Sequence, residues 1–262
     1  MKTLIVLSVL SLCNAFPMPS SFTKCDKRKP DFNECLSEAV RNAIGQLVKP
    51  MEKYHLPSFE PFQFASLSPK SGVQGGSSST VVKFRNYRIY GRTKIDSSKA
   101  KMNFEDNTLT LELSHPEIRY EFDYEAKGKM FVLPFDSAGH GTVTLSKILP
   151  QKFYFFKLSI SENPIYTIKF TLEEYVKDNK KYLRVVDSNM TLKPESMTMY
   201  FENLFKNKVL NDAFNREMSE SWKVILANFS AGYMDSYAKV YGDVFNNFLE
   251  VVPLVDLFEG VQ

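Results

Sequence analysis

The three histidines of the chain, His55, His115 and His140, are the residues best suited to acid–base catalysis or to zinc binding. Each lies in a different segment, and none has a second histidine, a cysteine or an aspartate at the spacing of H-E-x-x-H or C-x-x-C. The chain also lacks a G-x-S-x-G nucleophile motif, and His140 stands in the glycine-rich stretch "SAGHG", where a surface histidine is typical. We therefore expect no metal site, no cofactor and no enzymatic function.

The carboxylates of the chain follow a pattern that also argues against catalysis. In "IRYEFDYE" at residues 118–125, every second side chain is apolar or aromatic (Ile118, Tyr120, Phe122, Tyr124) and the others are charged (Arg119, Glu121, Asp123, Glu125). A period of two is that of a β-strand with one buried and one solvated face, so the carboxylates are expected in water instead of paired across a cleft. The rings must face either protein core or a bound apolar molecule.

The same period runs from Val81 to about Phe201, in segments such as "TLTLEL", "GKMFVLPF", "GTVTLSKI", "KFYFFKLSI" and "PIYTIKFTL". Turn signals separate these segments, among them "SHP", "AKG", "SAGHG", "SENP" and "KDNKK". We expect an antiparallel meander with one solvated face. The other face is so rich in Phe, Tyr, Ile, Leu and Met that another apolar element must cover it.

A long amphipathic helix is predicted to supply that cover. Between Pro194 and Pro253 there is no proline, and from Leu204 apolar residues recur every three or four positions: Leu210, Phe214, Met218, Trp222, Ile225, Phe229, Tyr233, Tyr237, Val240, Val244 and Phe248. A helix of about 40 residues would be about 60 Å long. Gly232 and Gly242 are the positions where it could bend.

The amino-terminal part of the chain has the features of a secreted protein. Residues 1–15, "MKTLIVLSVLSLCNA", resemble a cleaved signal peptide, and we expect residues 16–262 to form a single mature domain. Cleavage removes Lys2 and lowers the formal net charge from +3 to +2, which is too weak to recruit nucleic acid. No later stretch is long and apolar enough to span a membrane. We expect an extracellular monomer without nucleic-acid or integral membrane partners.

Secretion also bears on the cysteines and asparagines. Cys13 leaves with the signal, and Cys25 and Cys35 remain, so a disulfide between them is predicted. Asn189 in "NMT" and Asn228 in "NFS" are candidate glycosylation sites.

A short helix is predicted after the cysteines, because apolar residues repeat there at helical spacing: Leu36, Val40, Ile44 and Leu47. Asn33 is a possible cap of this helix and Pro50 a stop.

Five segments of the chain carry a family resemblance: "CDKRKPDFNECLSEAVRNAIGQL", "FRNYRIYG", "LTLELSHPEIRYEFDYEAKGKMFVLPFDSAGHG", "YFENLFKNKVLNDAFNREMSESW" and the final "VVPLVDLF". In these segments the chain resembles the takeout and juvenile-hormone-binding family of secreted insect proteins. These segments span nearly the whole mature chain. Their order and spacing together carry the resemblance, since no single motif is diagnostic.

The resemblance implies an α+β fold: one long carboxy-terminal helix wrapped by a strongly curved antiparallel sheet, a short amino-terminal helix nearby, and a hydrophobic tunnel between sheet and long helix. It implies a secreted carrier of one small lipophilic molecule, such as a juvenile-hormone-like terpenoid or a fatty acid. The residues expected to line the tunnel are Phe84, Leu111, Leu113, Ile118, Tyr120, Phe122, Tyr124, Val132, Ile168, Phe170, Met199, Phe214, Met218, Trp222, Ile225 and Phe229.

An alternative function is interaction with lipid aggregates or microbial surfaces, which similar folds also perform. An apolar patch on the outside of the tip regions, including "VVPLVDLF", would favour that alternative. For any single aromatic residue, ordinary packing in the protein core is the simplest explanation of its inward position.

Overall fold

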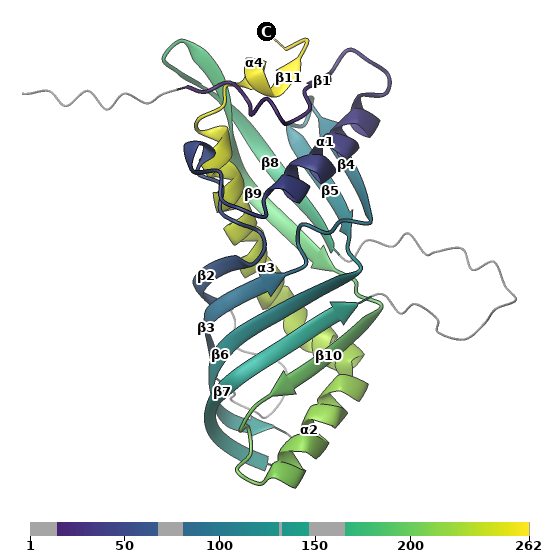
Figure 1. Cartoon of the computed structure of the whole chain (residues 1–262), viewed down its shortest axis with the longest axis vertical. Coiled ribbons are helices and arrows are strands. Elements are labelled where there is room, and N and C mark those ends of the chain that lie inside the picture. The colour runs from purple at the N-terminus through teal and green to yellow at the C-terminus, as the bar shows by residue number, and fades with distance from the viewer. Residues whose placement is uncertain (1–14, 68–80, 131–132, 147–165, 262) are drawn as a thin grey trace, which may run out of the picture.

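The computed structural model describes residues 15–67, 81–130, 133–146 and 166–261. The chain forms an elongated molecule with helices along a tube of strands, as Figure 1 shows. Its helices are α1 (Phe32–Gln46), the 3-10 turn η1 (Glu52–Tyr54), α2 (Lys208–Glu220), α3 (Trp222–Leu249) and α4 (Leu254–Leu257). Its strands are β1 (Cys25–Asp26), β2 (Phe62–Leu67), β3 (Val81–Tyr90), β4 (Ser97–Asn103), β5 (Thr108–Ser114), β6 (Glu117–Met130), β7 (Leu133–Ser146), β8 (Tyr166–Lys177), β9 (Lys180–Leu192), β10 (Ser196–Phe201) and β11 (Phe258–Glu259).

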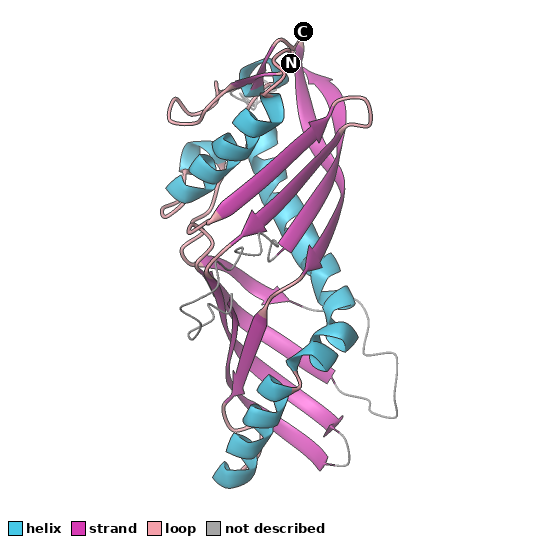
Figure 2. Ribbon diagram, turned by 90° about the vertical axis from the view of Figure 1, so that its right-hand side faces the viewer, coloured by secondary structure: helices cyan, strands magenta, loops and turns pink. Residues whose placement is uncertain are grey.

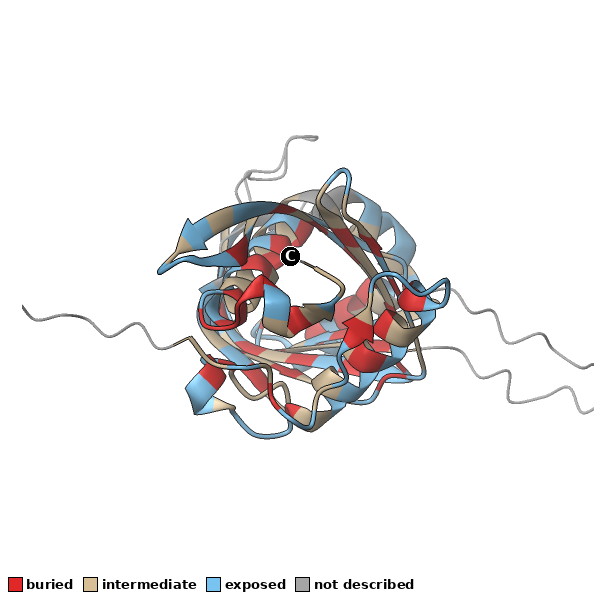
Figure 3. Ribbon diagram, turned by 90° about the horizontal axis from the view of Figure 1, so that it is seen from above, coloured by how far each residue is buried: buried red, intermediate tan, exposed pale blue. Residues whose placement is uncertain are grey.

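The α+β class is as expected, but nine of the described strands divide into two antiparallel sheets, and β1 and β11 form a separate parallel pair. One sheet has the order β10-β7-β6-β3-β2 and the other the order β4-β5-β8-β9. Figure 2 shows the two sheets one above the other, with helix running along both. The chain passes between the sheets at "SHP", where Pro116 has no N–H to continue the β5 ladder. Seen along its length, the molecule is a tube with a wall of strands and helices (Figure 3).

The alternation in "IRYEFDYE" sets the faces of β6 as predicted. Ile118, Tyr120, Phe122 and Tyr124 are buried, with exposed fractions of 5% or less. The charged residues between them lie outside, where Glu121 pairs with Arg88 and Arg119, and Glu125 pairs with Arg85. The rings therefore face the interior of the tube.

The predicted turns at "AKG" and "SAGHG" are wrong, because both stretches lie inside long strands, β6 and β7. Gly141 is the register partner of Phe122, and a Cβ added there would stand 2.3 Å from the Phe122 ring. The glycine thus makes room for a large side chain on the neighbouring strand, which is a common use of glycine within sheets. His140 points outward, with its Nδ1 3.3 Å from Asp123 Oδ1.

The single helix of about 40 residues is also corrected: α2 and α3 are separate helices that meet at Ser221. α2 packs on β10 of the first sheet, whereas α3 packs on β9 of the second. The helical path must change direction to follow two sheets, and it does so at Ser221 and not at Gly232 or Gly242, both of which lie inside α3. α3 alone, with 28 residues, is about 42 Å long.

Small polar side chains fasten these helices to the edges of the sheets. The Asn246 carboxamide of α3 accepts from the Val185 N–H at 2.6 Å and donates to the Val185 carbonyl at 3.1 Å. On α2, Asn215 makes the same pair of bonds with Phe201, at 2.8 and 3.0 Å. Ser219 accepts from and donates to the backbone of Met199. These bonds satisfy edge groups that a strand partner would otherwise take.

The short amino-terminal helix α1 lies against β4, with its apolar face inward. Asp31, and not Asn33, occupies the N-cap position. Asn33 instead accepts a hydrogen bond from Met102 N–H, and Ser37 accepts one from Ala100 N–H. α1 is thus bonded to an edge strand as α2 and α3 are.

The predicted disulfide between Cys25 and Cys35 is confirmed. It links β1 to α1, and β1 pairs in parallel with β11 close to the carboxy terminus. Both ends of the described chain are therefore joined at one end of the tube (Figure 1).

The predicted signal peptide falls almost wholly on residues 1–14, outside the described residues. Asn189 is exposed on β9, whereas the side chain of Asn228 in α3 is not described. Among the described helices, none is both long and apolar enough to cross a membrane.

Candidate binding cavities

A first cavity, of about 180 Å³, lies between the five-stranded sheet and the helices α2 and α3. The inner faces of β3, β6, β7 and β10 form one wall, with Leu192 at the end of β9. One face of α2 and the part of α3 from Ile225 to Tyr237 form the other wall. Eight of the residues expected to line a tunnel are in this wall: Phe84, Tyr120, Phe122, Tyr124, Met199, Phe214, Met218 and Ile225. We call it the lower cavity, because the five-stranded sheet and α2 lie in the lower half of Figure 1.

A second cavity, of about 240 Å³, lies between the four-stranded sheet, α1 and the second half of α3. Here four expected residues line the wall: Leu111, Leu113, Ile168 and Phe170. They come from β5 and β8, where Leu111 pairs with Ile168, so their side chains share one face of the sheet. α1 contributes Leu36, Ala39, Val40, Ala43 and Ile44, and α3 contributes Tyr241, Val244, Phe245 and Phe248. We call this one the upper cavity.

Of the other four expected residues, the two whose side chains are described line neither cavity. Ile118 is wholly buried in the core, and Trp222 is half-buried at the start of α3, packed against the core. Val132 lies outside the described residues, and Phe229 lies in α3 with a side chain that is not described. The stripe of apolar residues on the helix thus mixes cavity wall with ordinary packing.

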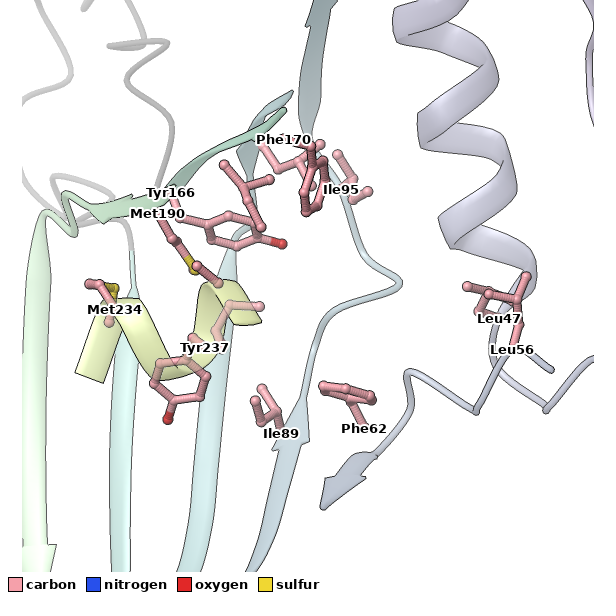
Figure 4. Close-up of a cluster of buried hydrophobic side chains, with 14 of the residues drawn as sticks. Leu47, Leu56, Phe62, Ile89, Ile95, Tyr166, Phe170, Met190, Met234 and Tyr237 are labelled. Carbon is pink, nitrogen blue, oxygen red and sulfur yellow. The ribbon is translucent and has the colours of Figure 1, made fainter. Parts of the chain in front are cut away.

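The described residues line two cavities where one tunnel is expected, and no described residue lines both. Tyrosines stand at their adjoining ends. Tyr87, Tyr120 and Tyr237 line the lower cavity with ring centroids 6.0 to 6.2 Å apart. Tyr166 and Tyr241 line the upper one. Figure 4 shows Ile89 and Phe62 from one sheet and Tyr166 from the other near the turn of α3 that carries Tyr237.

The side chains that line both cavities are mostly apolar, with a few hydroxyl groups among them. In the lower cavity the described polar groups are Ser230 and the tyrosine hydroxyls. Burial raises the pKa of Tyr87, Tyr120 and Tyr237, so these hydroxyls stay neutral at physiological pH and act as hydrogen-bond donors or acceptors. Within the described ranges, no group of three His, Cys, Asp or Glu residues is placed to hold a metal ion. Such a site can enclose an apolar molecule and orient it through a few polar contacts.

Sequence reasoning missed several residues of the upper cavity, above all Arg92. It follows Gly91, whose φ of +87° turns the chain at the end of β3, and a Cβ at Gly91 would meet the Glu117 carbonyl at 2.3 Å. This turn carries the Arg92 side chain inward to an exposed fraction of 1%. An arginine is ordinarily placed on the surface, so only the adjoining glycine in "IYGR" could have indicated the turn.

Comparison with known proteins agrees with this architecture. The family described as haemolymph juvenile hormone binding protein matches residues 3–259. Circadian clock-controlled protein daywake of Drosophila melanogaster is 22% identical over 249 residues, which are 92% of this chain and 88% of the relative. The same protein from Drosophila yakuba is 19% identical over 248 residues, with the same coverage of both chains. Among solved structures, Epiphyas postvittana Takeout 1 superposes with a TM-score of 0.68 at 16% identity, covering 91% of this chain and 99% of that one.

Proposed function

The chain belongs to the haemolymph juvenile hormone binding protein family, and from this premise we propose that it is a carrier that encloses a small lipophilic molecule in its apolar interior. The family consists of binding proteins, and the chain is not an enzyme. The cargo belongs to the class of terpenoids, fatty acids and similar molecules. Its contacts are the cavity-lining residues of the two sheets, of α1, and of α2 with α3.

The observation that carries this proposal is the pair of apolar cavities against α3. A cavity of about 150 Å³ lined by Leu, Ile and Phe can stay dry and bind benzene. The cavities of about 180 and 240 Å³ are each larger than that. Their Phe, Tyr and Met side chains provide an adaptable lining, because methionine in particular can change its shape at low cost.

Burial of apolar surface is sufficient to drive such binding. A fifteen-carbon chain gains about 12 kcal/mol at about 0.8 kcal/mol per carbon, and association costs at least about 4 kcal/mol. The difference of about 8 kcal/mol corresponds to a micromolar dissociation constant. One methylene contributes only about 1 to 3 kcal/mol to discrimination, so specificity must come from cavity length and from the polar groups in the wall.

We further propose that residues 1–15 are a signal peptide and that residues 16–262 are the secreted mature protein, a monomer glycosylated at Asn189 or Asn228. The disulfide between Cys25 and Cys35 is in keeping with an oxidising extracellular environment. Asn189 is accessible on the outer surface of β9.

The alternative, docking on lipid aggregates or microbial surfaces, has less support from the described surface. In the segment "VVPLVDLF", the side chains of Val251, Val252, Leu254 and Leu257 are buried. Val255 is the exposed large apolar residue of this segment, at 54%. Most apolar side chains of this segment thus pack in the protein core and do not form an exposed patch.

The carrier function is tested by extracting the purified secreted protein with organic solvent and analysing the extract by mass spectrometry. The delipidated protein is then titrated with terpenoids, fatty acids and alcohols in a calorimeter. We expect a lipophilic compound in the extract and saturable binding of at least one compound class. Ala126→Leu, which fills the lower cavity, and Ala43→Phe, which fills the upper one, should weaken binding in the cavity that holds the cargo. An empty extract together with no binding in the titrations would contradict the proposal.

A further inference from the structure

Arg92 places a charged group inside the apolar wall of the upper cavity. Its side chain is 1% exposed and lines that cavity together with Tyr166 and Tyr241. The guanidinium carbon lies 4.5 Å from the centroid of the Tyr166 ring and 4.9 Å from that of Tyr241. The aromatic faces stabilise the cation in part, and the hydroxyls of both tyrosines lie near it, but neither hydroxyl stands in hydrogen-bonding geometry to its N–H groups.

The guanidinium is unpaired among the described residues. None of its three nitrogens has a hydrogen-bond acceptor there, and no described carboxylate forms an ion pair with it. The nearby carboxylate of Glu60 is already used, since it accepts from Gly91 N–H and from the Thr93 hydroxyl. An arginine keeps its charge in proteins, so the upper cavity contains a buried cation with unmet donors.

A buried, unpaired charge is unfavourable for the folded state, and a methionine of similar length would fill the same space without that cost. The backbone of this turn is nevertheless fixed around Arg92. His115, which is wholly buried, lies with Nε2 3.1 Å from the Arg92 carbonyl oxygen. A carbonyl only accepts, so this contact assigns a hydrogen to Nε2. The turn therefore fixes the backbone from which the Arg92 side chain enters the wall.

A second unmet polar group stands beside it. The Tyr241 hydroxyl is buried and has no hydrogen-bond partner among the described residues. Burial raises the pKa of Tyr241, so it remains a neutral O–H donor. The guanidinium N–H groups and this phenolic O–H belong to neighbouring residues of a largely apolar cavity wall, and together they form a site for a small planar anion.

We propose that the upper cavity binds the carboxylate head of a long-chain carboxylic acid, with its oxygens on the Arg92 guanidinium and the Tyr241 hydroxyl and its chain among the Leu, Ile and Phe side chains. This inference rests on the proposed carrier function and specifies the cargo of the upper cavity. A carboxylate matches one guanidinium in shape and in charge. A phosphate monoester carries close to two negative charges, and within the described wall of this cavity Arg92 is the single cation.

The test compares three ligands of equal chain length, decanoic acid, methyl decanoate and decanol, by calorimetric titration of the delipidated mature protein at neutral pH. We expect the wild-type protein to prefer the acid. Arg92→Met should lower the affinity for the acid by about 10- to 100-fold, as the loss of charge-assisted hydrogen bonds predicts, with little change for the ester. Tyr241→Phe keeps the ring and should lower acid affinity by about 2- to 10-fold.

Arg85→Met is the matched control, because Arg85 lies on the outer face of β3 and pairs with Glu125. It should leave the preference for the acid intact. Arg92→Lys retains the charge without the planar fork and gives a second variant should Arg92→Met fold poorly; its acid affinity should fall between those of Arg92→Met and wild type.

The outcomes separate the two proposals. Loss of the acid preference in Arg92→Met or Arg92→Lys, with Arg85→Met unaffected, supports the carboxylate site. Equal binding of acid, ester and alcohol by the wild type, or an acid preference that survives in the Arg92 variants, overturns the carboxylate site and leaves the carrier function standing. Absence of binding for all three ligands and for the wider ligand series overturns both.

Discussion

Arg92 rests on the face of Tyr166, with the guanidinium carbon 4.5 Å from the ring centroid, in a place where a carboxylate would be the usual partner. A cation–π contact of this kind contributes about 2 kcal/mol when desolvated, which is less than the cost of burying a charge. The relationship therefore predicts how the ligand-free protein responds to removal of the cation.

We expect Arg92→Met to leave the free energy of unfolding of the delipidated protein unchanged, or to raise it by up to about 2 kcal/mol, because replacement of a buried charge by an apolar side chain is often neutral or stabilising. Urea unfolding followed by circular dichroism measures the change. A loss of more than about 2 kcal/mol would mean that the guanidinium is needed by the fold itself.

The two faces of β6 predict opposite responses to an acidic side chain. Phe122→Asp places an unpaired carboxylate at a position that is 2% exposed and removes the contact with Phe84, so we expect a loss of more than about 4 kcal/mol and little secreted protein. Glu121→Asp puts the same aspartate on the outer face and should change stability by less than about 0.5 kcal/mol. Comparable secretion of the two variants would show that the faces are reversed.

The disulfide closes a loop of ten residues between β1 and α1. We expect the double variant Cys25→Ser, Cys35→Ser to lose roughly 2 to 3 kcal/mol, the value that chain entropy predicts for a loop of about this length. Peptide mapping of the secreted wild type should recover the two cysteines in one linked pair. Recovery of both as free thiols would falsify the assignment in solution.

The hydrogen bonds between α2 and β10 are predicted to contribute to stability, because the Asn215 side chain that makes two of them is buried. Asn215→Leu leaves Phe201 N–H without its acceptor and removes one donor from the Phe201 carbonyl, so we expect a loss of about 2 to 4 kcal/mol in urea unfolding. Arg216→Leu, at the next and exposed position, is the control and should stay within about 0.5 kcal/mol. Equal effects of the two substitutions would contradict this role of Asn215.

Trp222, the only tryptophan, should report weakly on ligand binding, because it packs beside the lower cavity without lining it. In a Trp222→Phe background, Tyr233→Trp places a reporter in the wall of the lower cavity and Phe245→Trp one in the upper. We expect the reporter of the occupied cavity to shift its emission saturably at one ligand per chain, and Trp222 to change little. A large response of Trp222 with silent reporters would contradict the assignment of the cavity walls.

Much of this architecture could be predicted from local patterns. Alternation along "IRYEFDYE" identified the inner side chains because a strand offers only two faces. Cys25 and Cys35 could be paired because removal of Cys13 leaves no other partner. Parity and helical spacing select interior positions, and twelve of the residues expected to line a tunnel lie in the two cavity walls, eight in the lower and four in the upper.

The rest depends on contacts between segments far apart in the chain. The sequence around Gly141 predicts a turn. Its place within a strand is explained only by its pairing with Phe122, whose ring occupies the space of a Cβ. The apolar repeat continues across Ser221, so the break between α2 and α3 becomes evident only once two sheets require two helix directions. The burial of Arg92 could not be predicted, because the residue is charged and no apolar pattern in the sequence marks the turn at Gly91 that directs its side chain inward.

The polar side chains on the helices have a further consequence for how this protein behaves among its own copies. Strands at the edge of a sheet present unpaired backbone groups on which another chain can add a strand and begin aggregation. Here β4, β9 and β10 are edge strands, and Ser37 of α1, Asn246 of α3 and Asn215 of α2 each occupy backbone groups of one of them. A chain so rich in β-structure and aromatic residues thereby keeps these three edges from recruiting neighbours, and detachment of a helix, before any loss of the core, is the event that would expose such an edge to fibril-like association.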